Sequence, residues 1–256
     1  MPNPQTIFNL IQPVNMKFLS AIILTVLCGH LNAQQFISKG MIEYEVIKNN
    51  HKALGDGSWA EMFKDKIPKL STSYYQLTFD NDKSIYKFNR KNETKQVSFM
   101  NDNTEEDIWY NDYANENFVQ QKSIFGETYI LTDSLIKIDW KITNENRQIA
   151  GFNCRKAVGK LFDSVYVFAF YTDEITLSGG PMSLHGLPGM IMGITIPRMF
   201  CSWVATKLQV NGIDASKITA PTKGKKKKAK ELQVTVVNAT KEWGSWGQQA
   251  VWGIFL

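Results

Sequence analysis

A glycine- and proline-rich stretch, residues 179–197 (GGPMSLHGLPGMIMGITIP), constrains the fold of this chain more than any other feature. Its first eleven residues contain four glycines and two prolines. Pro188 followed by Gly189 suits the central positions of a type II turn, which requires a positive φ at Gly189. Ordered loops of this length inside a compact domain are usually functional. We therefore expect an ordered loop with Leu184 and Leu187 packed inward, because exposed leucines here would form an apolar patch.

The six residues 186–191 (GLPGMI) resemble the signature of the GLPGLI family of Bacteroidota proteins, with one difference at Met190. Four more segments resemble that family in the same order: GMIEYE at 40–45, GFNCRKA at 151–157, FYTDEI at 170–175 and EWGSWGQQAVW at 242–252. The resemblance implies a location in the cell envelope or outside the cell. It implies no reaction.

Residues 16–33 have the pattern of a signal peptide, in which a lysine at position 17 precedes an apolar run over 18–27. The run is shorter than the roughly twenty residues that span a bilayer, although a retained anchor stays an alternative. We expect cleavage after Ala33, so that residues 1–33 are a non-structural leader and 34–256 form one β domain. A lipoprotein would be acylated at Cys28, but the bulky Leu27 before it disfavours this. The expected location is periplasmic, outer-membrane-associated or secreted.

Two cysteines, Cys154 and Cys201, remain after removal of the leader. An oxidising compartment permits a disulfide between them. Both lie in strand-like segments, where a buried free thiol is also common. The sequence leaves their pairing open.

Positive charge is concentrated in KGKKKKAK, residues 223–230. Such a run can meet acidic lipid or nucleic acid. Because it lies between two expected strands, we interpret it as a solvated loop. We expect no nucleic-acid partner for an exported protein and leave peripheral contact with the outer membrane open.

Apolar and polar residues alternate along much of the chain, which is typical of half-buried strands. The alternation is clear at 42–46, at 75–88 around an Asp80–Asp82 turn, and at 136–142, where Ile136, Ile138, Trp140 and Ile142 share one face. The pattern also predicts strands at 97–99, 107–110, 118–122, 128–131, 151–160, 190–196, 201–210 and 232–237. The run 165–172 is apolar on both faces and predicts a central strand.

Helical signals are few. Ser58 and Glu61 form a capping-box pattern before a short helix that Pro68 ends, and Trp243, Trp246 and Ala250 share one helical face near the C-terminus. We expect a mainly β protein: a single antiparallel sheet, strongly curved or half-closed around a hydrophobic groove, with one or two short helices.

The sequence contains no recognisable catalytic constellation. Only His51 and His185 remain after the leader, without zinc-site spacing, and no serine has the glycine pattern of a nucleophile elbow. We expect no enzyme activity and no cofactor. The expected function is binding of a hydrophobic ligand or a partner protein of the envelope, with the glycine-rich loop as rim. The candidate binding residues are Asp173, Glu174, Pro181, His185, Gly186, Leu187, Pro188 and Gly189.

A metal-binding function is the alternative. Met182, His185, Met190 and Met192 bring thioether and imidazole donors to one loop, and such donors suit Cu(I). Methionines also fill irregular gaps in cores. Because Met190 and Met192 lie on one face of an expected inward-facing strand, we favour the core interpretation.

Overall fold

The structure, a computed structural model, describes residues 36–92, 103–162 and 164–256. Phe36–Leu256 form one unit. The strands within these ranges are β1 (Lys39–Asn49), β2 (Leu70–Asp80), β3 (Lys83–Lys91), β4 (Ile108–Asp112), β5 (Asn117–Ile124), β6 (Glu127–Ser134), β7 (Lys141–Ile149), β8 (Phe152–Leu161), β9 (Val165–Thr172), β10 (Met190–Ile196), β11 (Cys201–Gln209) and β12 (Lys225–Lys228).

The α-helices are α2 (Asn50–Leu54), α3 (Ser58–Lys64), α4 (Ala229–Thr240) and α5 (Ser245–Phe255). Single 3₁₀ turns occur at η4 (Asn103–Glu106), η5 (Pro197–Met199), η6 (Ala215–Lys217) and η7 (Lys241–Trp243). No helix in the described ranges is long and apolar enough to cross a membrane.

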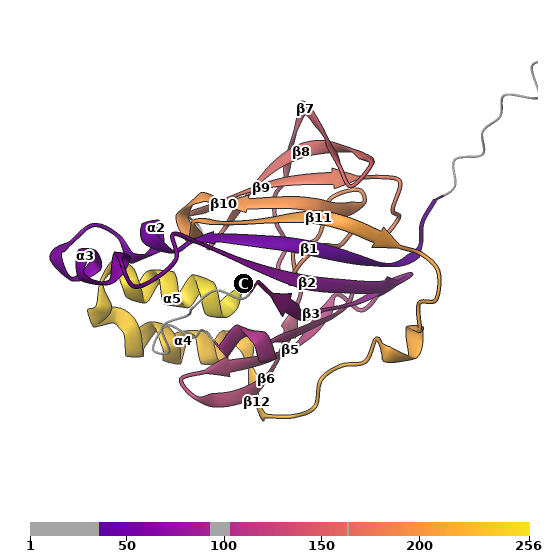
Figure 1. Cartoon of the computed structure of the whole chain (residues 1–256). Coiled ribbons are helices and arrows are strands. Elements are labelled where there is room, and N and C mark those ends of the chain that lie inside the picture. The colour runs from indigo at the N-terminus through magenta and orange to yellow at the C-terminus, as the bar shows by residue number, and fades with distance from the viewer. Residues whose placement is uncertain (1–35, 93–102, 163) are drawn as a thin grey trace, which may run out of the picture. The chain divides into compact units, whose positions relative to one another are not determined.

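The described strands form one sheet in the order β12-β6-β5-β4-β3-β2-β1-β11-β10-β9-β8-β7 (Figure 1). Two antiparallel meanders meet in it: β1 to β6 form one, and β7 to β11 form the other. They join where β1 pairs with β11, so that Met41 lies opposite Gln209. Among these described strands, only β12 pairs in parallel, along β6. The expected mainly β, antiparallel fold is confirmed.

The sheet is open, with β12 at one edge and β7 at the other. The strongly curved or half-closed sheet expected from the sequence is therefore not the architecture found. Many short strands and abundant turns are typical of both open and closed sheets, so the sequence pattern did not distinguish them.

Alternation along β1 buries every second side chain. Ile42 and Tyr44 have no exposed surface, and Tyr44 Oη donates a 2.6 Å hydrogen bond to the backbone oxygen of Ile191 in β10. This buried face belongs to the main hydrophobic cluster, which also contains most of β9 and β10. Burial on both faces of β9 was expected correctly, but β9 is third from the β7 edge and not central.

The strand expected over 136–142 is wrong for most of its length. Residues 135–140 connect β6 to β7 without strand pairing, and β7 begins only at Lys141. Ile138 and Trp140 instead lie against Gly159 of β8, where a Cβ atom would come within 2.7 and 2.8 Å of their side chains. An extended segment crossing a sheet face has the same two-residue alternation as a strand, which explains the error.

The strand expected at 232–237 is also wrong, because these residues belong to α4. Leu232, Val236 and Thr240 are buried at four-residue spacing, so tertiary packing selects a helix despite the β-branched residues between them. The lysine run before it is exposed, as expected, but Lys225–Lys228 form strand β12 and not a loop.

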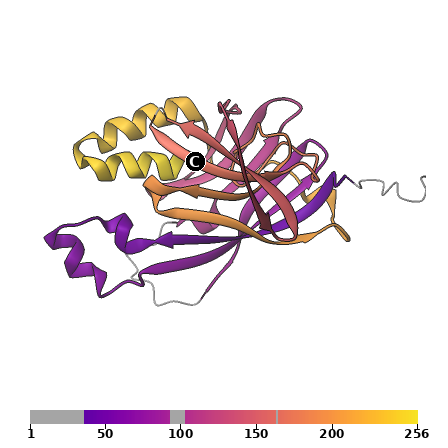
Figure 2. The same ribbon diagram turned by 90° about the horizontal axis from the view of Figure 1, so that it is seen from above.

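Helices α4 and α5 lie side by side (Figure 2). Their apolar side chains pack against those of β5 and β6. The sequence predicted one or two short helices, and both of these helices are longer than that. The capping box at Ser58 is wrong as well: Gly57 is the N-cap of α3, no side chain caps it, and Glu61 pairs with Lys64.

Two expectations lie outside the described residues. One is the leader over 1–33 with its cleavage site after Ala33. The other is the short strand at 97–99. Both stay predictions.

Candidate functional site

The glycine-rich segment is an ordered loop whose apolar side chains pack inward. Leu184 is 4% exposed and Leu187 is 1% exposed, as expected from the sequence. Gly189 has a φ of 135°, and a Cβ atom there would lie 2.0 Å from the backbone oxygen of Thr172. The close approach of the loop to the end of β9 therefore requires glycine at this position.

The turn before β10 differs from the type II turn that was expected. The Gly189 N–H donates to the Leu187 carbonyl at 2.7 Å, which closes a three-residue turn around Pro188. A second tight turn lies earlier in the loop, where the Leu184 N–H donates to the Pro181 carbonyl at 3.3 Å and Met182 has a φ of 61°. The second turn presents Ser183 to the sheet.

A buried polar cluster holds the tip of the loop on β4 and β5. The Asn111 side-chain amide donates to the Met182 carbonyl at 2.9 Å and accepts from Ser183 Oγ, also at 2.9 Å. Gln120 Nε2 donates to Ser183 Oγ at 3.0 Å. Asn111 and Gln120 are almost fully buried, so these bonds offset the cost of removing their amides from water.

Two aromatic residues complete the anchoring of the loop. Trp140 Nε1 donates to the His185 carbonyl at 2.8 Å, and the ring of Tyr113 lies 6.0 Å from that of His185. Burial lowers the pKa of His185 below 6.5 and raises the pKa of Tyr113 above 10.0. Both groups are therefore neutral at pH 7, and neither is suited to act as a strong base there.

A cavity of about 390 Å³ lies beside this loop tip. Its lining comes from strands β5 and β6, the 135–140 connection, the end of β8, the loop and both C-terminal helices. Nine lining residues are apolar: Phe118, Ile136, Ile138, Leu161, Phe162, Leu184, Ala229, Phe255 and Leu256. Six are polar: Gln120, Asp133, Ser134, Ser183, Lys230 and Gln233.

The volume and the mainly apolar lining are those of a small-molecule site. The polar lining residues are few, and some are already engaged. Asp133 accepts from the Lys230 N–H at the first turn of α4, at 3.3 Å. Gln120 and Ser183 bond to each other. The arrangement can hold an apolar molecule, but it contains no nucleophile activated by a base.

None of the eight residues expected to bind lines this cavity. Pro181, Leu187 and Gly189 are buried in the loop, whereas Gly186 and Pro188 are exposed. Asp173 and Glu174 form a turn after β9, where the Glu174 carbonyl accepts from the Ile37 N–H at 2.9 Å. The loop residues that do reach the cavity are Ser183 and Leu184.

Sequence reasoning missed the other cavity residues because they come from distant segments. Phe118 and Gln120 occupy inward positions of an alternating strand, and a glutamine at such a position is the one signal that could have marked the site. Of the α4 residues that line the cavity, the sequence pattern assigned Gln233 to a strand and Ala229 and Lys230 to a solvated loop. The wall that this helix contributes was therefore not predicted.

The four side chains proposed as Cu(I) ligands differ in their burial. Met182, Met190 and Met192 are buried in the main hydrophobic cluster, and His185 is half-buried with Nδ1 3.2 Å from the Ser183 carbonyl oxygen. In the described ranges, no group of three or more His, Cys, Asp and Glu residues could hold a metal ion. The thioether set itself stays a prediction.

Both cysteines are free thiols. Cys154 is buried and Cys201 is half-buried, and burial raises their pKa values to about 11 and about 12. These thiols are protonated at neutral pH, which makes them poor nucleophiles.

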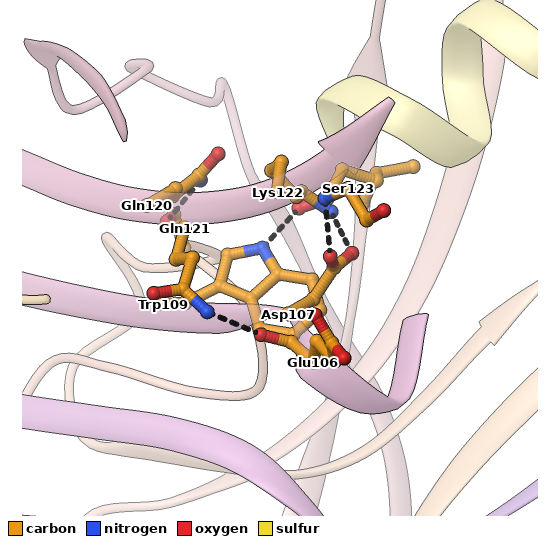
Figure 3. A network of polar contacts seen from close by, with 9 residues as sticks. Glu106, Asp107, Trp109, Gln120, Gln121, Lys122 and Ser123 are labelled. Atoms are coloured by element: carbon orange, nitrogen blue, oxygen red, sulfur yellow. Dashed lines mark hydrogen bonds and ion pairs between the residues drawn. The ribbon is translucent and has the colours of Figure 1, made fainter. Parts of the chain in front are cut away.

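A buried ion pair lies farther along β5, where Lys122 shares the buried face of the strand with Gln120 (Figure 3). Lys122 Nζ lies 3.1 Å from Asp107 Oδ2, and the two side chains are 2% and 4% exposed. The ammonium also lies 4.1 Å from the centre of the Trp109 ring. Burial lowers the pKa of Lys122, and the charge of Asp107 opposes that shift.

Trp109 links this pair to the helices. Its Nε1 donates to the backbone oxygen of Leu256 at 2.8 Å, and Leu256 lines the cavity. Asp107 Oδ1 in turn accepts from the Ser123 N–H at 3.0 Å. The pair therefore positions the end of α5 against β4 and β5, and neither of its side chains lines the cavity.

No protein-family model matches this chain. No curated protein matches it either.

Solved structures do resemble it. PNGF-II in a P21 crystal form aligns with a TM-score of 0.51 and 16% identity over 81% of this chain and 34% of that chain. The chain thus spans about a third of the length of the PNGF-II chain that it matches. At this identity the likeness shows a shared fold alone.

Two further structures align at lower scores. An uncharacterized conserved protein from Thermus thermophilus aligns at a TM-score of 0.37 with 5% identity, over 80% of this chain and 99% of that chain. MucB in complex with MucA(peri) aligns at 0.32 with 9% identity, over 80% of this chain and 61% of that chain. At these scores neither likeness carries an argument about function.

Proposed function

We propose that this chain is a non-enzymatic binding protein of the cell envelope that holds a small hydrophobic ligand. The observation that supports this most directly is the cavity of about 390 Å³ beside the loop tip. Its lining is mainly apolar, with polar side chains at a few places, as in sites that bind apolar molecules with a polar end. Export and membership of the GLPGLI family are part of the proposal and rest on the sequence patterns.

The loop has a structural role in this proposal. Leu184 supplies part of the apolar wall, and Ser183 supplies a hydroxyl next to Gln120. Residues 186–189 hold this tip in place because Gly189 packs on the end of β9. The signature residues of the loop thus shape the site without lining it.

A neutral fluorescent probe, N-phenyl-1-naphthylamine, tests the cavity. We expect it to bind the purified protein with a saturable increase in fluorescence. Ala229 lines the cavity at the start of α4, so Ala229→Phe should fill the space and weaken binding at least about tenfold. Ala239→Phe is the matched control, because Ala239 lies on the exposed side of the same helix.

Circular dichroism melting of both variants establishes that they are folded. The proposal is wrong if the native protein does not bind the probe. It is also wrong if the two folded variants bind it equally well.

A further inference from the structure

Strand β12 is a row of four exposed lysines at the edge of the sheet. Lys225 forms an ion pair with Glu127 at 2.5 Å. The described structure shows no acidic partner within ion-pair distance of Lys226, Lys227 or Lys228. We call Lys225–Lys228 the lysine edge.

Two exposed aromatic residues lie at one end of the lysine edge. Phe125 is 60% exposed and Trp243 is 50% exposed, and their rings pack edge to face with centroids 6.2 Å apart. Phe125 precedes by two residues the Glu127 that pairs with Lys225. The lysine edge therefore begins beside the aromatic pair, at Lys225, and continues from there along the edge of the sheet.

The backbone holds Phe125 in an unfavourable conformation. The β5–β6 hairpin has a two-residue loop, in which Phe125 has a φ of 50° and Gly126 a φ of 81°. Turns of this kind favour Asn, Asp or Gly at the first position, because other residues are strained at a positive φ. Phe125 is neither buried nor suited to its turn, so folding alone does not account for it.

Lysines on an edge strand are by themselves a common protection against aggregation. That role does not require exposed aromatic residues beside them. Lysines attracted to anionic headgroups, next to aromatic rings that enter the headgroup region, are instead the combination found on proteins that bind membrane surfaces. An acidic protein would pair with the lysines but would leave the aromatic pair unexplained.

We propose that the lysine edge and the aromatic pair form a docking surface for a lipid bilayer with anionic headgroups. The chain binds peripherally, with the lysines against the headgroups and Phe125 and Trp243 in the interface. This inference does not rest on the cavity, because none of these six residues lines it.

Sedimentation with vesicles tests the proposal. The purified protein should bind vesicles of equal parts phosphatidylcholine and phosphatidylglycerol, and binding should weaken at high salt. It should not bind vesicles of phosphatidylcholine alone. Binding to neither kind of vesicle, or equally to both, would overturn the proposal, and so would binding to polyglutamate without binding to vesicles.

Charge-matched variants test the lysine edge. Lys226→Gln with Lys228→Gln should weaken vesicle binding about 30-fold, at roughly a factor of five for each lysine near an anionic surface. Lys160→Gln with Lys207→Gln removes the same charge from exposed positions on β8 and β11 and should bind like the native protein. Equal binding by the two double variants would refute the role of the lysine edge.

Phe125→Asn tests the aromatic pair without a loss of stability. Asparagine suits the turn, so the variant should unfold at the same or a higher denaturant concentration and still bind vesicles several-fold more weakly. Met62→Gln is the control, because Met62 is exposed to the same degree on α3, at 62%. The proposal fails if Phe125→Asn binds vesicles as tightly as Met62→Gln does.

Discussion

At the scale of single residues, the two glycines of the signature loop differ in what surrounds them. Gly189 and Gly186 both have a positive φ, at 135° and 93°. A Cβ atom at Gly189 would collide with backbone at 2.0 Å, whereas one at Gly186 would meet only the Trp140 ring at 3.6 Å. The first position is closed to any side chain, and the second is restricted only by its backbone angles.

Alanine at each position should therefore have a different cost. Gly186→Ala should lower the free energy of unfolding by about 1 kcal/mol through its left-handed conformation. Gly189→Ala adds the collision with Thr172 and should cost about 3 kcal/mol or more. Urea unfolding of the two variants measures the difference. Equal costs would show that the loop does not depend on close packing against β9.

His185 makes the stability of the protein depend on pH. Burial lowers its pKa in the folded state below 6.5, so between the two pKa values the unfolded chain binds more protons than the folded one. Stability is then complete above about pH 6.5 and falls as the pH falls through that window. Urea unfolding from pH 7.5 to pH 5 should show a smaller decline for His185→Gln than for the native protein.

His51→Gln is the control for this experiment. It should keep the decline caused by His185. If His185→Gln and His51→Gln followed the same pH dependence, the neutral state of His185 would not be linked to folding.

At the scale of elements, the contact of α5 with the sheet depends on a buried charge pair. Lys122 of β5 and Asp107 before β4 are both nearly inaccessible to water and flank the tryptophan that bonds Leu256. A buried pair contributes little over apolar residues, but removal of one partner leaves an uncompensated charge. Substitution of one partner should therefore weaken the contact between α5 and the sheet strongly.

Lys122→Met should destabilise the protein by about 3–5 kcal/mol, because Asp107 loses its counter-charge in a buried position. Lys122→Met with Asp107→Asn should recover much of this, since the amide oxygen can still accept from Ser123. Lys156→Met breaks a partly exposed pair with Glu145 and should cost less than about 1 kcal/mol. Denaturant unfolding compares them, and similar costs for both lysine variants would contradict this account.

At the scale of the whole molecule, the sequence predicted what depends on neighbours along the chain. The alternation in β1, the hairpin of β2 and β3, the positive φ of Gly189 and the inward leucines all follow from local patterns. The junction of β1 with β11 and the cavity do not, because they depend on residues more than a hundred positions apart. The polar cluster was missed for the same reason, since Gln120 and Ser183 come from different meanders.

Two errors have a common physical cause. Residues 135–140 and 232–237 have the composition and alternation of strands, yet one crosses a sheet face and the other is helical. Packing partners decide between these states, and the partners are Gly159 for the first and the neighbouring α5 for the second. The alternation within each segment does not reveal which partner packs against it.

The junction of the two meanders also affects the order in which the strands can pair during synthesis. Because Met41 pairs with Gln209, a chain made from its N-terminus has β1 and β2 in place long before β11 exists. Until then, the far side of β1 offers unpaired backbone groups and a row of apolar side chains to any neighbouring strand. Pairings this distant also form slowly. The nascent chain is therefore prone to aggregate until β11 has been made. During that time β1 is the strand that a chaperone would have to cover.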